Sequence, residues 1–477
     1  MVAGVGEPMF FTGGEWRRPT GESSCDVVNP ANGEVLATVR SCSDEDVELA
    51  VAAAGDALAK WAATPVAERV ALLRRLRDAI AEDADRLALL ITRQMGTPIG
   101  FSRAAQIGLP LRTFDVVLAE VDALEDERVG RSAIVRDPAG VVAAITPWNF
   151  PLHQIAAKIV PALAAGCTVV LKPSEVTPLD AIRLTELIEA VGFPDGVFNL
   201  VLGAADAGRA LVSRRGVSMV SFTGSTAAGR AIAAVAGGDL KKLSLELGGK
   251  SANILLDDVA FAEVVPQAIG QCFVNAGQTC AALTRLIVPA QRLPEIEAIA
   301  LAALAEWRPG DPEQADTRMG PLSSARQRDR VAELVSRALD GGARVVGPAP
   351  GLAPRKVGDA FFPPIVLSDV DNGMEIAREE VFGPVLVLMP YADEDEAVRI
   401  ANDSAYGLSG GVWSADLDRA EAVGRRLRTG QVILNGAMLD MEAPFGGVGQ
   451  SGLGRENGRY GLDEFFSLKA ITRPAAK

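Results

Sequence analysis

Between residues 141 and 246 the chain alternates short apolar runs with longer segments in which apolar residues recur at helical spacing. Apolar runs of this length, bounded by turn residues, are typical of buried strands. The predicted strands are 141–146, 168–172, 197–202, 219–223 and 243–246. Strands that alternate with helices in this way predict a doubly wound, Rossmann-like parallel sheet of the α/β class, with ligands at the carboxyl ends of the strands.

The regions on either side have other patterns. Residues 8–40 predict short strands joined by turns, and residues 44–93 have the spacing of packing helices. Residues 133–137, closed by P-A-G at 138–140, predict an exposed hairpin that leaves the main body. A second alternation from about 258 to 435 predicts another α/β domain, which contains Cys280. Its predicted helices are near 260–275, 292–306, 323–340 and 415–427, and its predicted strands are near 284–289, 384–389 and 431–435.

Composition narrows the classes of function. The chain has 477 residues and a formal net charge of −14, so we expect two or three domains and no nucleic-acid or anionic-membrane partner. Five cysteines without a C-x-x-C pair predict neither a disulfide framework nor a metal site, and a reducing cytoplasm fits best. The first residues lack the features of a secretory signal, and the longest apolar stretch, 160–171, is too short to span a bilayer.

Four predicted strands end in turns rich in polar residues or glycine. The turns are T-P-W-N-F-P at 146–151, K-P-S-E at 172–175, F-T-G-S-T-A-A-G at 222–229 and E-L-G-G-K at 246–250. The glycines at Gly224 and Gly229 precede a helix, so backbone N–H groups there suit a pyrophosphate, although a tight strand-to-helix turn explains them equally well. Lys172 and Glu175 suit the hydroxyls of an adenosine ribose, with a surface ion pair as the alternative.

Cys280 lies in N-A-G-Q-T-C-A, a break between a helical segment and an apolar run. A thiol in such a break can face a cleft, although cysteine is more often a buried packing residue. Glu246 ends an apolar strand immediately before two glycines, so we expect a thiol nucleophile and a carboxylate base to share one site. Asn149 offers an amide donor that can stabilise an oxyanion.

Other motifs are weaker. The literal G-x-G-x-x-G at 447–452 follows a loop and leads into a second glycine-rich run, so it lacks the context of a dinucleotide fingerprint. The G-x-S-x-G at 407–411 would need a later histidine, but the single histidine, His153, lies far upstream. With one histidine in the chain a carboxylate is the more available base for Cys280, and Glu380 is a second candidate besides Glu246.

Seven motifs in this order resemble the NAD(P)-dependent aldehyde dehydrogenases over nearly the whole chain. They are T-P-W-N-F-P, L-K-P-S-E, F-T-G-S, L-E-L-G-G-K, G-Q-T-C, E-E-V-F-G-P and P-F-G-G. The resemblance implies that Cys280 attacks the aldehyde as a thiolate and that Asn149, with the Cys280 backbone N–H, holds the resulting oxyanion. Glu246 would then activate the water that hydrolyses the thioester. Gly449 stands where many relatives carry lysine, and no role is assigned to it.

The resemblance also implies NAD as the cofactor, leaves NADP open, and implies no metal. The implied cofactor-binding residues are Thr146, Pro147, Trp148, Lys172, Ser174, Glu175, Gly208, Phe222, Gly224, Ser225, Gly229, Leu247, Glu380 and Phe382. The implied substrate-binding residues are Phe150, His153, Ala157, Thr279, Ala281, Leu439 and Phe445. Ala157 is smaller than the aromatic residue of many relatives, so a wide, mostly apolar tunnel and a bulky or hydrophobic aldehyde are expected.

The family pattern implies a division of the chain into three parts. These are an NAD-binding domain at 1–117 and 140–247, a catalytic domain at 248–450, and a small β oligomerisation arm with the C-terminal segment at 118–139 and 451–477. The arm implies a homodimer or homotetramer. Two alternative functions remain: a CoA-acylating semialdehyde dehydrogenase, which would not need Glu246, and a silent scaffold, which would not need Cys280, Glu246 and Asn149 together.

Overall fold

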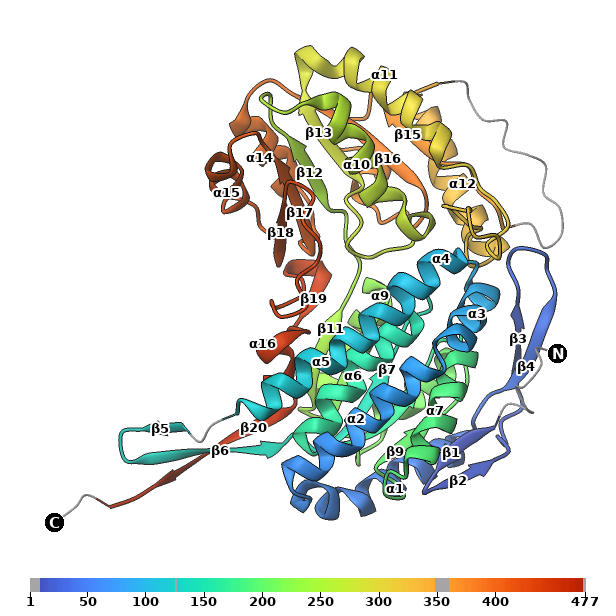
Figure 1. The fold of residues 1–477 in the computed structure, drawn as a ribbon, viewed down its shortest axis with the longest axis vertical. Coiled ribbons are helices and arrows are strands. Elements are labelled where there is room, and N and C mark those ends of the chain that lie inside the picture. The colour runs from blue at the N-terminus through green and yellow to red at the C-terminus, as the bar shows by residue number, and fades with distance from the viewer. Residues whose placement is uncertain (1–8, 125–126, 348–359, 475–477) are drawn as a thin grey trace.

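The computed structural model describes residues 9–124, 127–347 and 360–474. Two α/β bodies lie one above the other in Figure 1, and a narrow β arm projects from the lower body. The N-terminal residues expected to lack a secretory signal fall largely outside the described residues. Within the described ranges, no helix is long and apolar enough to cross a membrane.

The lower body is built on an eight-stranded sheet with the order β19-β11-β10-β7-β8-β9-β1-β2. Its five central strands are parallel: β11 (Lys242–Glu246), β10 (Met219–Thr223), β7 (Val141–Ile145), β8 (Thr168–Lys172) and β9 (Phe198–Leu200). The edge strands β19 (Gly452–Leu453), β1 (Phe10–Thr12) and β2 (Glu15–Arg17) pair antiparallel. All five predicted strands are present, which confirms the doubly wound α/β class. Strands β7, β8, β9 and β10 are buried along their whole length, because helices cover both faces of the sheet.

Two layers of helices cover this sheet. The connecting helices are α1 (Asp44–Ala63), α6 (Pro151–Ala165), α7 (Leu179–Val191), α8 (Ala205–Ser213) and α9 (Thr226–Gly238). An outer layer is formed by α2 (Val66–Glu82), α3 (Ala84–Met95), α4 (Ile99–Phe101), the π-helical turn η1 (Ser102–Ile107) and α5 (Gly108–Asp122). Helix α6 lies between the sheet and α5, so all of its residues are buried. The helical pattern predicted for 44–93 forms three helices. Pro65 separates α1 from α2, and Asp83 separates α2 from α3.

The upper body has a seven-stranded sheet with the order β14-β15-β16-β13-β12-β17-β18. Its strands are β12 (Ala252–Leu255), β13 (Arg285–Pro289), β14 (Arg344–Val345), β15 (Ile365–Ser368), β16 (Val385–Tyr391), β17 (Ser409–Trp413) and β18 (Gln431–Leu434). Its helices are α10 (Phe261–Phe273), α11 (Leu293–Ala303), α12 (Ala325–Asp340), α13 (Glu375–Arg378), α14 (Glu394–Asn402) and α15 (Leu417–Gly424). The serine of the G-x-S-x-G pattern, Ser409, is buried at the start of β17 rather than on a strand-to-helix turn, so it has no elbow geometry.

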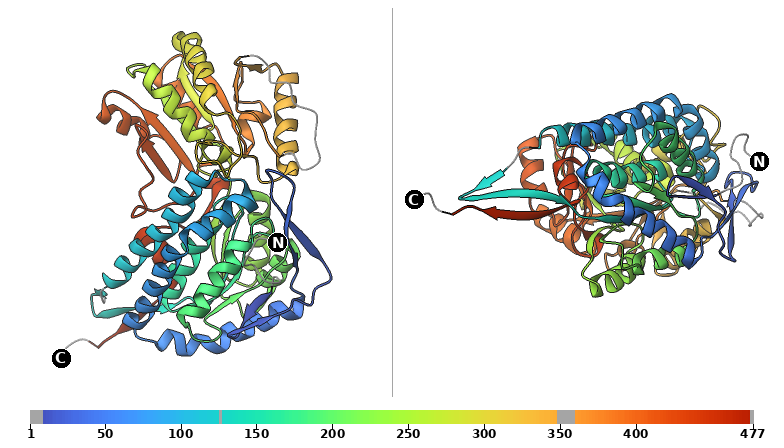
Figure 2. Two further views of the ribbon diagram at one scale, coloured as in Figure 1. Left: turned by 45° about the vertical axis from the view of Figure 1, so that its right-hand side comes forward. Right: turned by 90° about the horizontal axis from the view of Figure 1, so that it is seen from below.

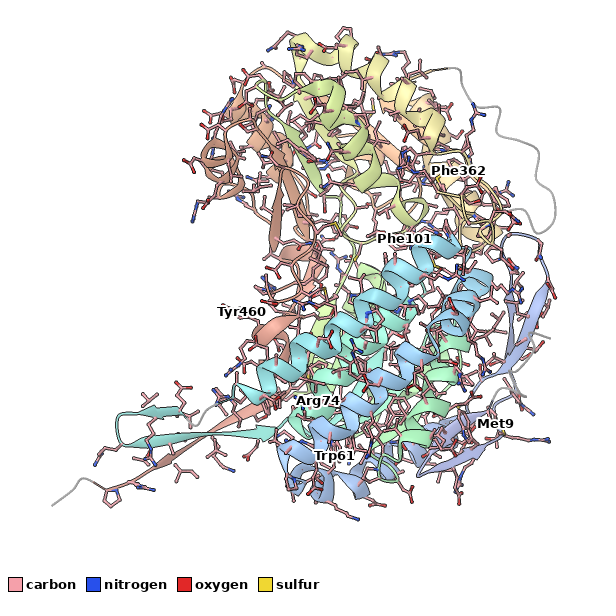
Figure 3. All side chains as sticks on the ribbon, viewed as in Figure 1. Met9, Trp61, Arg74, Phe101, Phe362 and Tyr460 are labelled. Carbon is pink, nitrogen blue, oxygen red and sulfur yellow. The ribbon has the colours of Figure 1, made fainter. Side chains whose placement is uncertain are left out.

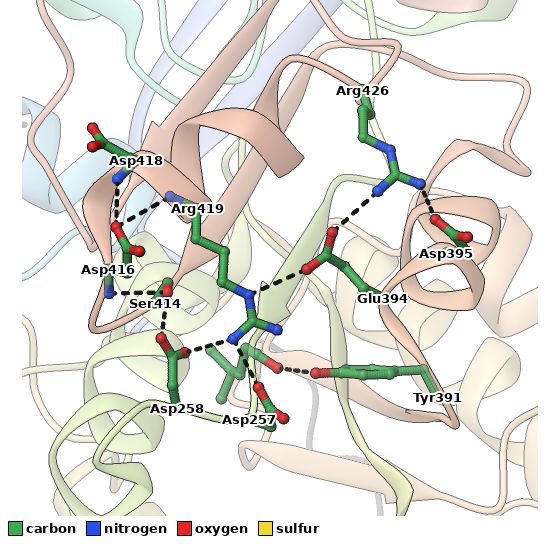
Figure 4. A network of polar contacts seen from close by, with 11 residues as sticks. Asp257, Asp258, Tyr391, Glu394, Asp395, Ser414, Asp416, Asp418, Arg419 and Arg426 are labelled. Atoms are coloured by element: carbon green, nitrogen blue, oxygen red, sulfur yellow. Dashed lines mark hydrogen bonds and ion pairs between the residues drawn. The ribbon is translucent and has the colours of Figure 1, made fainter.

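A network of ion pairs ties α14 and α15 to the carboxyl end of β12 (Figure 4). The Arg419 guanidinium contacts Asp257 at 2.9 Å and Glu394 at 3.2 Å, and Glu394 also pairs with Arg426 at 3.1 Å. Each ion pair is partly exposed and contributes little to stability alone. Because Glu394 and Arg419 each take part in more than one pair, the pairs form a network.

The arm is a three-stranded sheet of β5 (Glu127–Val129), β6 (Ser132–Pro138) and β20 (Phe466–Thr472), with β6 in the middle. It projects away from both bodies in the two views of Figure 2. The predicted hairpin lies on β5 and β6. Residues 118–122 of the segment assigned to the arm continue α5 instead, because Leu118 and Val121 are buried in the core.

The remaining short elements connect these parts. They are the two-stranded sheet of β3 (Ser24–Val28) and β4 (Val35–Arg40), helix α16 (Gly458–Asp463), and the 3₁₀ turns η2 (Val274–Gly277), η3 (Ala290–Arg292), η4 (Leu304–Glu306) and η5 (Gly449–Ser451). Part of the segment after residue 450 belongs to the lower body, because β19 pairs with β11 and α16 packs on α5 and α6.

Candidate active site

Cys280 follows an unusual turn between α10 and β13. Three consecutive residues, Asn275, Ala276 and Gly277, have left-handed backbone conformations with φ of 55°, 54° and 73°. Left-handed conformations strain non-glycine residues, and runs of them are rare. A Cβ at Gly277 would overlap the Gly383 carbonyl oxygen, so only glycine fits there. The turn breaks the helix and leaves Cys280 half-buried at its end.

The Cys280 thiol is held in a protonated state. Burial first, and then the neighbouring carboxylates of Glu380 and Glu246, raise the pKa of the thiol to about 12. A Cβ on Gly249 would lie 2.8 Å from the Cys280 carbonyl oxygen, so the end of β11 and the cysteine loop are in close contact. Because only a thiolate is strongly nucleophilic, this site needs a nearby base.

Glu246 ends strand β11, directly beside this contact. Its side chain is buried, and neither carboxylate oxygen has a hydrogen-bond partner in the described part of the chain. Burial, followed by the negative charge of Glu456, raises the pKa of Glu246 well above its usual value. A Cβ on Gly446 would lie 2.6 Å from Glu246 Oε1, so glycine is required for the loop to approach the carboxylate. A buried carboxylate with a raised pKa and no partners is suited to accept and release a proton.

A buried ion pair lies next to Glu246. Lys158 Nζ contacts Glu456 Oε1 at 2.5 Å and donates a hydrogen bond to Thr223 Oγ1 at 2.7 Å. The charge of Lys158 lowers the pKa of Glu246, opposing Glu456. Neither member was predicted from sequence, although a lysine inside the otherwise apolar run of α6 is a signal that could have identified it.

Asn149 reaches the cysteine loop from the end of β7. Its side-chain Nδ2 donates to the Gln278 carbonyl oxygen at 3.0 Å. Its own carbonyl oxygen accepts from Gln106 Nε2 at 2.9 Å and from Asn275 Nδ2 at 3.0 Å. The structure therefore brings together the three residues proposed for catalysis, Asn149, Glu246 and Cys280, from two sheets. Asn275 and Gln278 lie in the stretch quoted from the sequence, but no role was assigned to them, and Gln106 was not singled out.

The residues expected to hold adenosine lie at the carboxyl end of β8. Lys172 Nζ is 3.8 Å from Glu175 Oε2 and donates to the carbonyl oxygens of Pro173 and Gly203. Burial lowers the pKa of Lys172, whereas the charge of Glu175 raises it. A Cβ on Gly208 would lie 3.5 Å from Lys172 Cδ, so Gly208 borders the same site. Ser174 Oγ accepts from the Val176 N–H in the same turn.

Two glycines at the start of α9, Gly224 in the preceding turn and Gly229 in the helix, are closely packed against side chains. A Cβ on Gly224 would overlap the Phe222 ring, and one on Gly229 would overlap the Leu247 side chain. Ser225 caps α9 by accepting from the Ala228 N–H, and the first turn of this helix has no acidic residue. A helix N-terminus that begins beside a glycine is suited to a phosphate group.

The other expected cofactor residues lie between the two bodies. Glu380 Oε1 accepts from the Gly249 N–H at 3.1 Å, and burial raises the pKa of Glu380 to about 7. The rings of Trp148 and Phe382 meet edge to face with centroids 5.2 Å apart, and they come from opposite bodies. Thr146 and Pro147 precede Trp148, and the buried Thr146 Oγ1 has no partner among the residues described.

The residues expected to bind substrate come from three segments. Phe150 caps α6, and the buried His153 and Ala157 lie on its first turns. Burial lowers the pKa of His153 to about 4, so the imidazole is neutral. Thr279 and Ala281 flank Cys280, whereas the half-buried Leu439 and the buried Phe445 lie on the long loop after β18. Sequence reasoning missed Phe101, whose ring meets Phe150 at 6.1 Å and lies where α4 faces the upper body (Figure 3).

Comparison with known proteins agrees with this arrangement. The aldehyde dehydrogenase family model matches residues 16–471. The chain is 44% identical over 472 residues to a 3-succinoylsemialdehyde-pyridine dehydrogenase of a Pseudomonas species, and 41% identical over 470 residues to geranial dehydrogenase of Castellaniella defragrans, covering 97% of this chain and 98% of each relative. A cysteine-to-alanine mutant of aldehyde dehydrogenase C from Pseudomonas syringae, solved with NAD⁺ and octanal, superimposes with a TM-score of 0.96 at 43% identity over 98% of both chains.

A second solved structure supports the same assignment. Mycobacterium tuberculosis aldehyde dehydrogenase, solved with NAD⁺, superimposes with a TM-score of 0.94 at 38% identity over 98% of both chains. The matches cover nearly the whole chain, as the order of the seven motifs predicted. The chain therefore belongs to the aldehyde dehydrogenase family and is an oxidoreductase that acts on aldehydes.

Proposed function

We propose that Cys280, Glu246 and Asn149 together carry out the NAD-dependent oxidation of an aldehyde to its carboxylic acid. The observation that supports this most is the buried Glu246 carboxylate, which lacks hydrogen-bond partners within the described residues and acts on the pKa of the Cys280 thiol. Of the three carboxylates that act on this thiol, Glu380 is bonded to the Gly249 N–H and Glu456 is paired with Lys158. Glu246 is thus the one whose oxygens are available for protons.

In the first step the thiol proton passes to Glu246, and the Cys280 sulfur forms a bond to the aldehyde carbon. The carbonyl oxygen becomes an oxyanion in the resulting thiohemiacetal. Asn149 donates one side-chain N–H to Gln278, which leaves the second N–H of the amide for the oxyanion, beside the Cys280 backbone N–H. Donors fixed before the reaction stabilise the developing charge most effectively.

The residues at the strand ends fit NAD. Gly224, Gly229 and the start of α9 suit the pyrophosphate, and the Lys172 and Glu175 pair suits the adenosine ribose. Glu380 and the Trp148–Phe382 pair, contributed by both bodies, would flank the nicotinamide ribose and ring. When bound, NAD accepts the hydride that leaves the substrate carbon, which converts the thiohemiacetal into a thioester on Cys280.

Glu246 then releases the thiol proton to solvent. In the last step it takes a proton from a water molecule, whose oxygen attacks the thioester carbon. The carbon–sulfur bond breaks, the acid is released, and the Cys280 sulfur takes the proton back from Glu246. Glu246 must be ionised for this step, so hydrolysis should accelerate as pH rises through its raised pKa. Because Glu246 can activate water, hydrolysis of the thioester is favoured over transfer of its acyl group to CoA. Addition of CoA should therefore leave the rate of NADH formation unchanged.

The substrate we infer is a neutral, hydrophobic aldehyde. The expected tunnel residues include the apolar Phe150, Ala157 and Phe445, and the one ionisable member, His153, is neutral. Relatives named for geranial and solved with octanal support the same class. A panel of octanal, an aromatic aldehyde and a short dicarboxylic semialdehyde tests this proposal: equal kcat/KM for the semialdehyde would contradict it.

Glu175 supports a preference for NAD over NADP. Its carboxylate, close to Lys172, would accept from the ribose 2′-hydroxyl and repel a 2′-phosphate. The ratio of kcat/KM for the two cofactors should favour NAD in the wild type and move toward NADP in Glu175→Gln. A wild-type preference for NADP would contradict the role of this residue.

The arm supports a homo-oligomer, dimer or tetramer. Its strand β20 leaves Leu468 and Ile471 exposed, and β5 leaves Val129 exposed, which is unusual for an isolated sheet in water. We infer that the lower body binds NAD, that the upper body carries the nucleophile, and that the arm is a third unit. Light scattering tests the oligomeric state, and Leu468→Asp should lower the mass. The free state of all five cysteines supports a cytoplasmic location.

The role of Cys280 is tested by substitution. Cys280→Ala should abolish both the initial burst of NADH and steady turnover with octanal, and the equally small change Cys167→Ala should leave both unchanged. Cys167 is buried at the start of β8, at the opposite end of the strands from the site. Aldehyde-dependent NADH formation that survives Cys280→Ala would refute the proposed function.

A further inference from the structure

The backbone carbonyl oxygen of Asn149 accepts hydrogen bonds from two side-chain amides. Gln106 Nε2 donates to it at 2.9 Å and Asn275 Nδ2 at 3.0 Å, while the Asn149 side chain itself donates to the Gln278 carbonyl at 3.0 Å. All four residues are at least 96% buried. We call Gln106, Asn149, Asn275 and Gln278 the amide clamp. The clamp joins the helical layer of the lower body to the loop that carries Cys280.

Gln106 lies in a special part of the helical layer. It belongs to the π-helical turn η1, between α4 and α5. One extra residue per turn changes which side chains point inward, and π-helical turns within α-helices often occur at functional sites. Here the turn directs an uncharged amide with no exposed surface toward the Asn149 carbonyl.

The Asn275 side of the clamp is held from the same layer. Thr97 Oγ1 donates to Asn275 Oδ1 at 3.0 Å, and Gln278 Nε2 donates to the Asn275 carbonyl at 3.1 Å. Both contacts are made to the left-handed Asn275, whose strained conformation persists only where neighbours fix it. The clamp therefore fixes both the oxyanion amide and the approach to the nucleophile.

We propose that Gln106 is a positioning residue that aims the side-chain amide of Asn149 at the substrate oxyanion. The inference rests on the roles proposed above for Cys280 and Asn149. Without the Gln106 donor, the Asn149 carbonyl keeps one amide partner instead of two, so its peptide unit and side chain can rotate away from the oxyanion. Loss of an interaction that acts only on the oxyanion lowers the rate of the chemical step and leaves substrate binding unchanged.

Two substitutions at this position separate donation from packing. Gln106→Leu keeps a similar volume and removes the donor. Gln106→Glu keeps the shape, and its carboxyl group can donate to Asn149 only when protonated. As a matched control, Asn199→Leu removes another fully buried amide, which donates to the Val169 and Gly196 carbonyls of the first sheet, away from the cysteine loop.

The measurement is the rate of the NADH burst with octanal in rapid mixing, together with KM, NAD affinity and thermal stability. Loss of one hydrogen bond should slow the burst about tenfold in Gln106→Leu. KM and NAD affinity should stay within about twofold of the wild-type values, because a change of this size barely alters the binding free energy. Asn199→Leu should lose stability but keep the burst rate of the wild type.

Two further readouts exclude a merely structural role. The rate at which iodoacetamide alkylates Cys280 involves no oxyanion, so it should be unchanged in Gln106→Leu. In Gln106→Glu the burst rate relative to wild type should rise as pH falls, because only the protonated carboxyl group donates a hydrogen bond.

Each outcome bears on a different statement. A wild-type enzyme without an aldehyde-dependent burst would refute the proposed function and this inference with it. A normal wild-type burst that Gln106→Leu leaves unchanged would refute only the inference. Slower alkylation in parallel with a slower burst, or a pH-independent ratio in Gln106→Glu, would also overturn it, because Gln106 would then act on the nucleophile or on packing.

Discussion

The carboxyl groups of Glu246 and Asp180 are both buried, and burial is the main cause that raises the pKa of each. Their surroundings differ. Asp180 begins α7, and its Oδ1 accepts from Gln94 Nε2 at 2.5 Å, whereas neither oxygen of Glu246 has a partner within the described ranges. Asp180 lies in a packed helical layer, but Glu246 lies beside a thiol. A raised pKa thus marks burial in both regions, and only contact with a reactive group marks function.

Of the substitutions that test the difference between Glu246 and Asp180, replacement of Glu246 should have the largest effect on activity. Glu246→Gln keeps shape and removes the base, so steady turnover should fall by about 10²–10⁴-fold. The thioester would accumulate, so a slowed single burst of NADH should remain while hydrolysis stops. Rapid mixing followed by mass spectrometry of the acylated protein measures this. Full turnover in Glu246→Gln would show that another group activates water.

Gly277→Ala tests the turn that holds Cys280 beside Glu246. The new methyl would overlap the Gly383 carbonyl oxygen at a φ of 73°, so we expect a loss of burst amplitude of about 100-fold, from strain and a misplaced thiol. Gly237→Ala is the control, because its Cβ would meet nothing within 4 Å. Equal activity of both variants would mean that the left-handed turn does not position Cys280.

Asp180→Asn tests whether the raised pKa of Asp180 affects stability alone. The pKa of Asp180 is raised from 3.8 to about 7, so the folded state keeps a proton that the unfolded chain releases between these values. Stability is then lost as pH rises through this window, by at most about 4 kcal/mol. The asparagine carries no charge and still accepts from Gln94. The melting temperature of Asp180→Asn should exceed that of the wild type at about pH 8 and lose this advantage toward about pH 4.

Activity is the control for this prediction. Because Asp180 lies outside the site, the burst rate of Asp180→Asn should equal that of the wild type. An advantage in melting temperature that is independent of pH would contradict the raised pKa.

Thr97→Val should have the smallest effect. It removes the hydroxyl that donates to Asn275 Oδ1 but keeps the volume, so the burst rate should fall about threefold, in line with one hydrogen bond in a network with several others. Thr97→Ser keeps the donor and should match the wild type. A larger loss in Thr97→Ser than in Thr97→Val would show that the methyl group, not the hydroxyl, is important.

The first sheet was predictable from sequence because its strands are buried on both faces and are therefore continuous apolar runs. Strands β8 and β10 match their predicted ranges, 168–172 and 219–223. Strands β12 and β17 of the second sheet were not predicted. The first has four residues and follows a glycine-rich turn, and the second contains two glycines that indicate a loop.

The reacting groups of the site were visible because Glu246 and Asn149 lie at or just after strand ends and Cys280 follows a break in a helical segment, whereas their supports were not. Gln106 acts through a hydrogen bond to a residue 43 positions away, from a π-helical turn that has no recognisable spacing. The strained conformation of Asn275 depends on contacts with Thr97, which no local pattern encodes. Positioning depends on long-range contacts, so it appears only in three dimensions.

The strand that carries Glu246 is completed by residues from near the end of the chain. Strand β19 pairs with β11 in antiparallel register, with Gly452 opposite Glu246 and the Ser451 carbonyl accepting from the Leu247 N–H at 3.0 Å. On the ribosome, Glu246 is synthesised long before this partner emerges. A nascent chain that has not reached β19, or one released before it by a premature stop codon, therefore lacks a finished site, and reactivity toward aldehydes is delayed until this strand has been made.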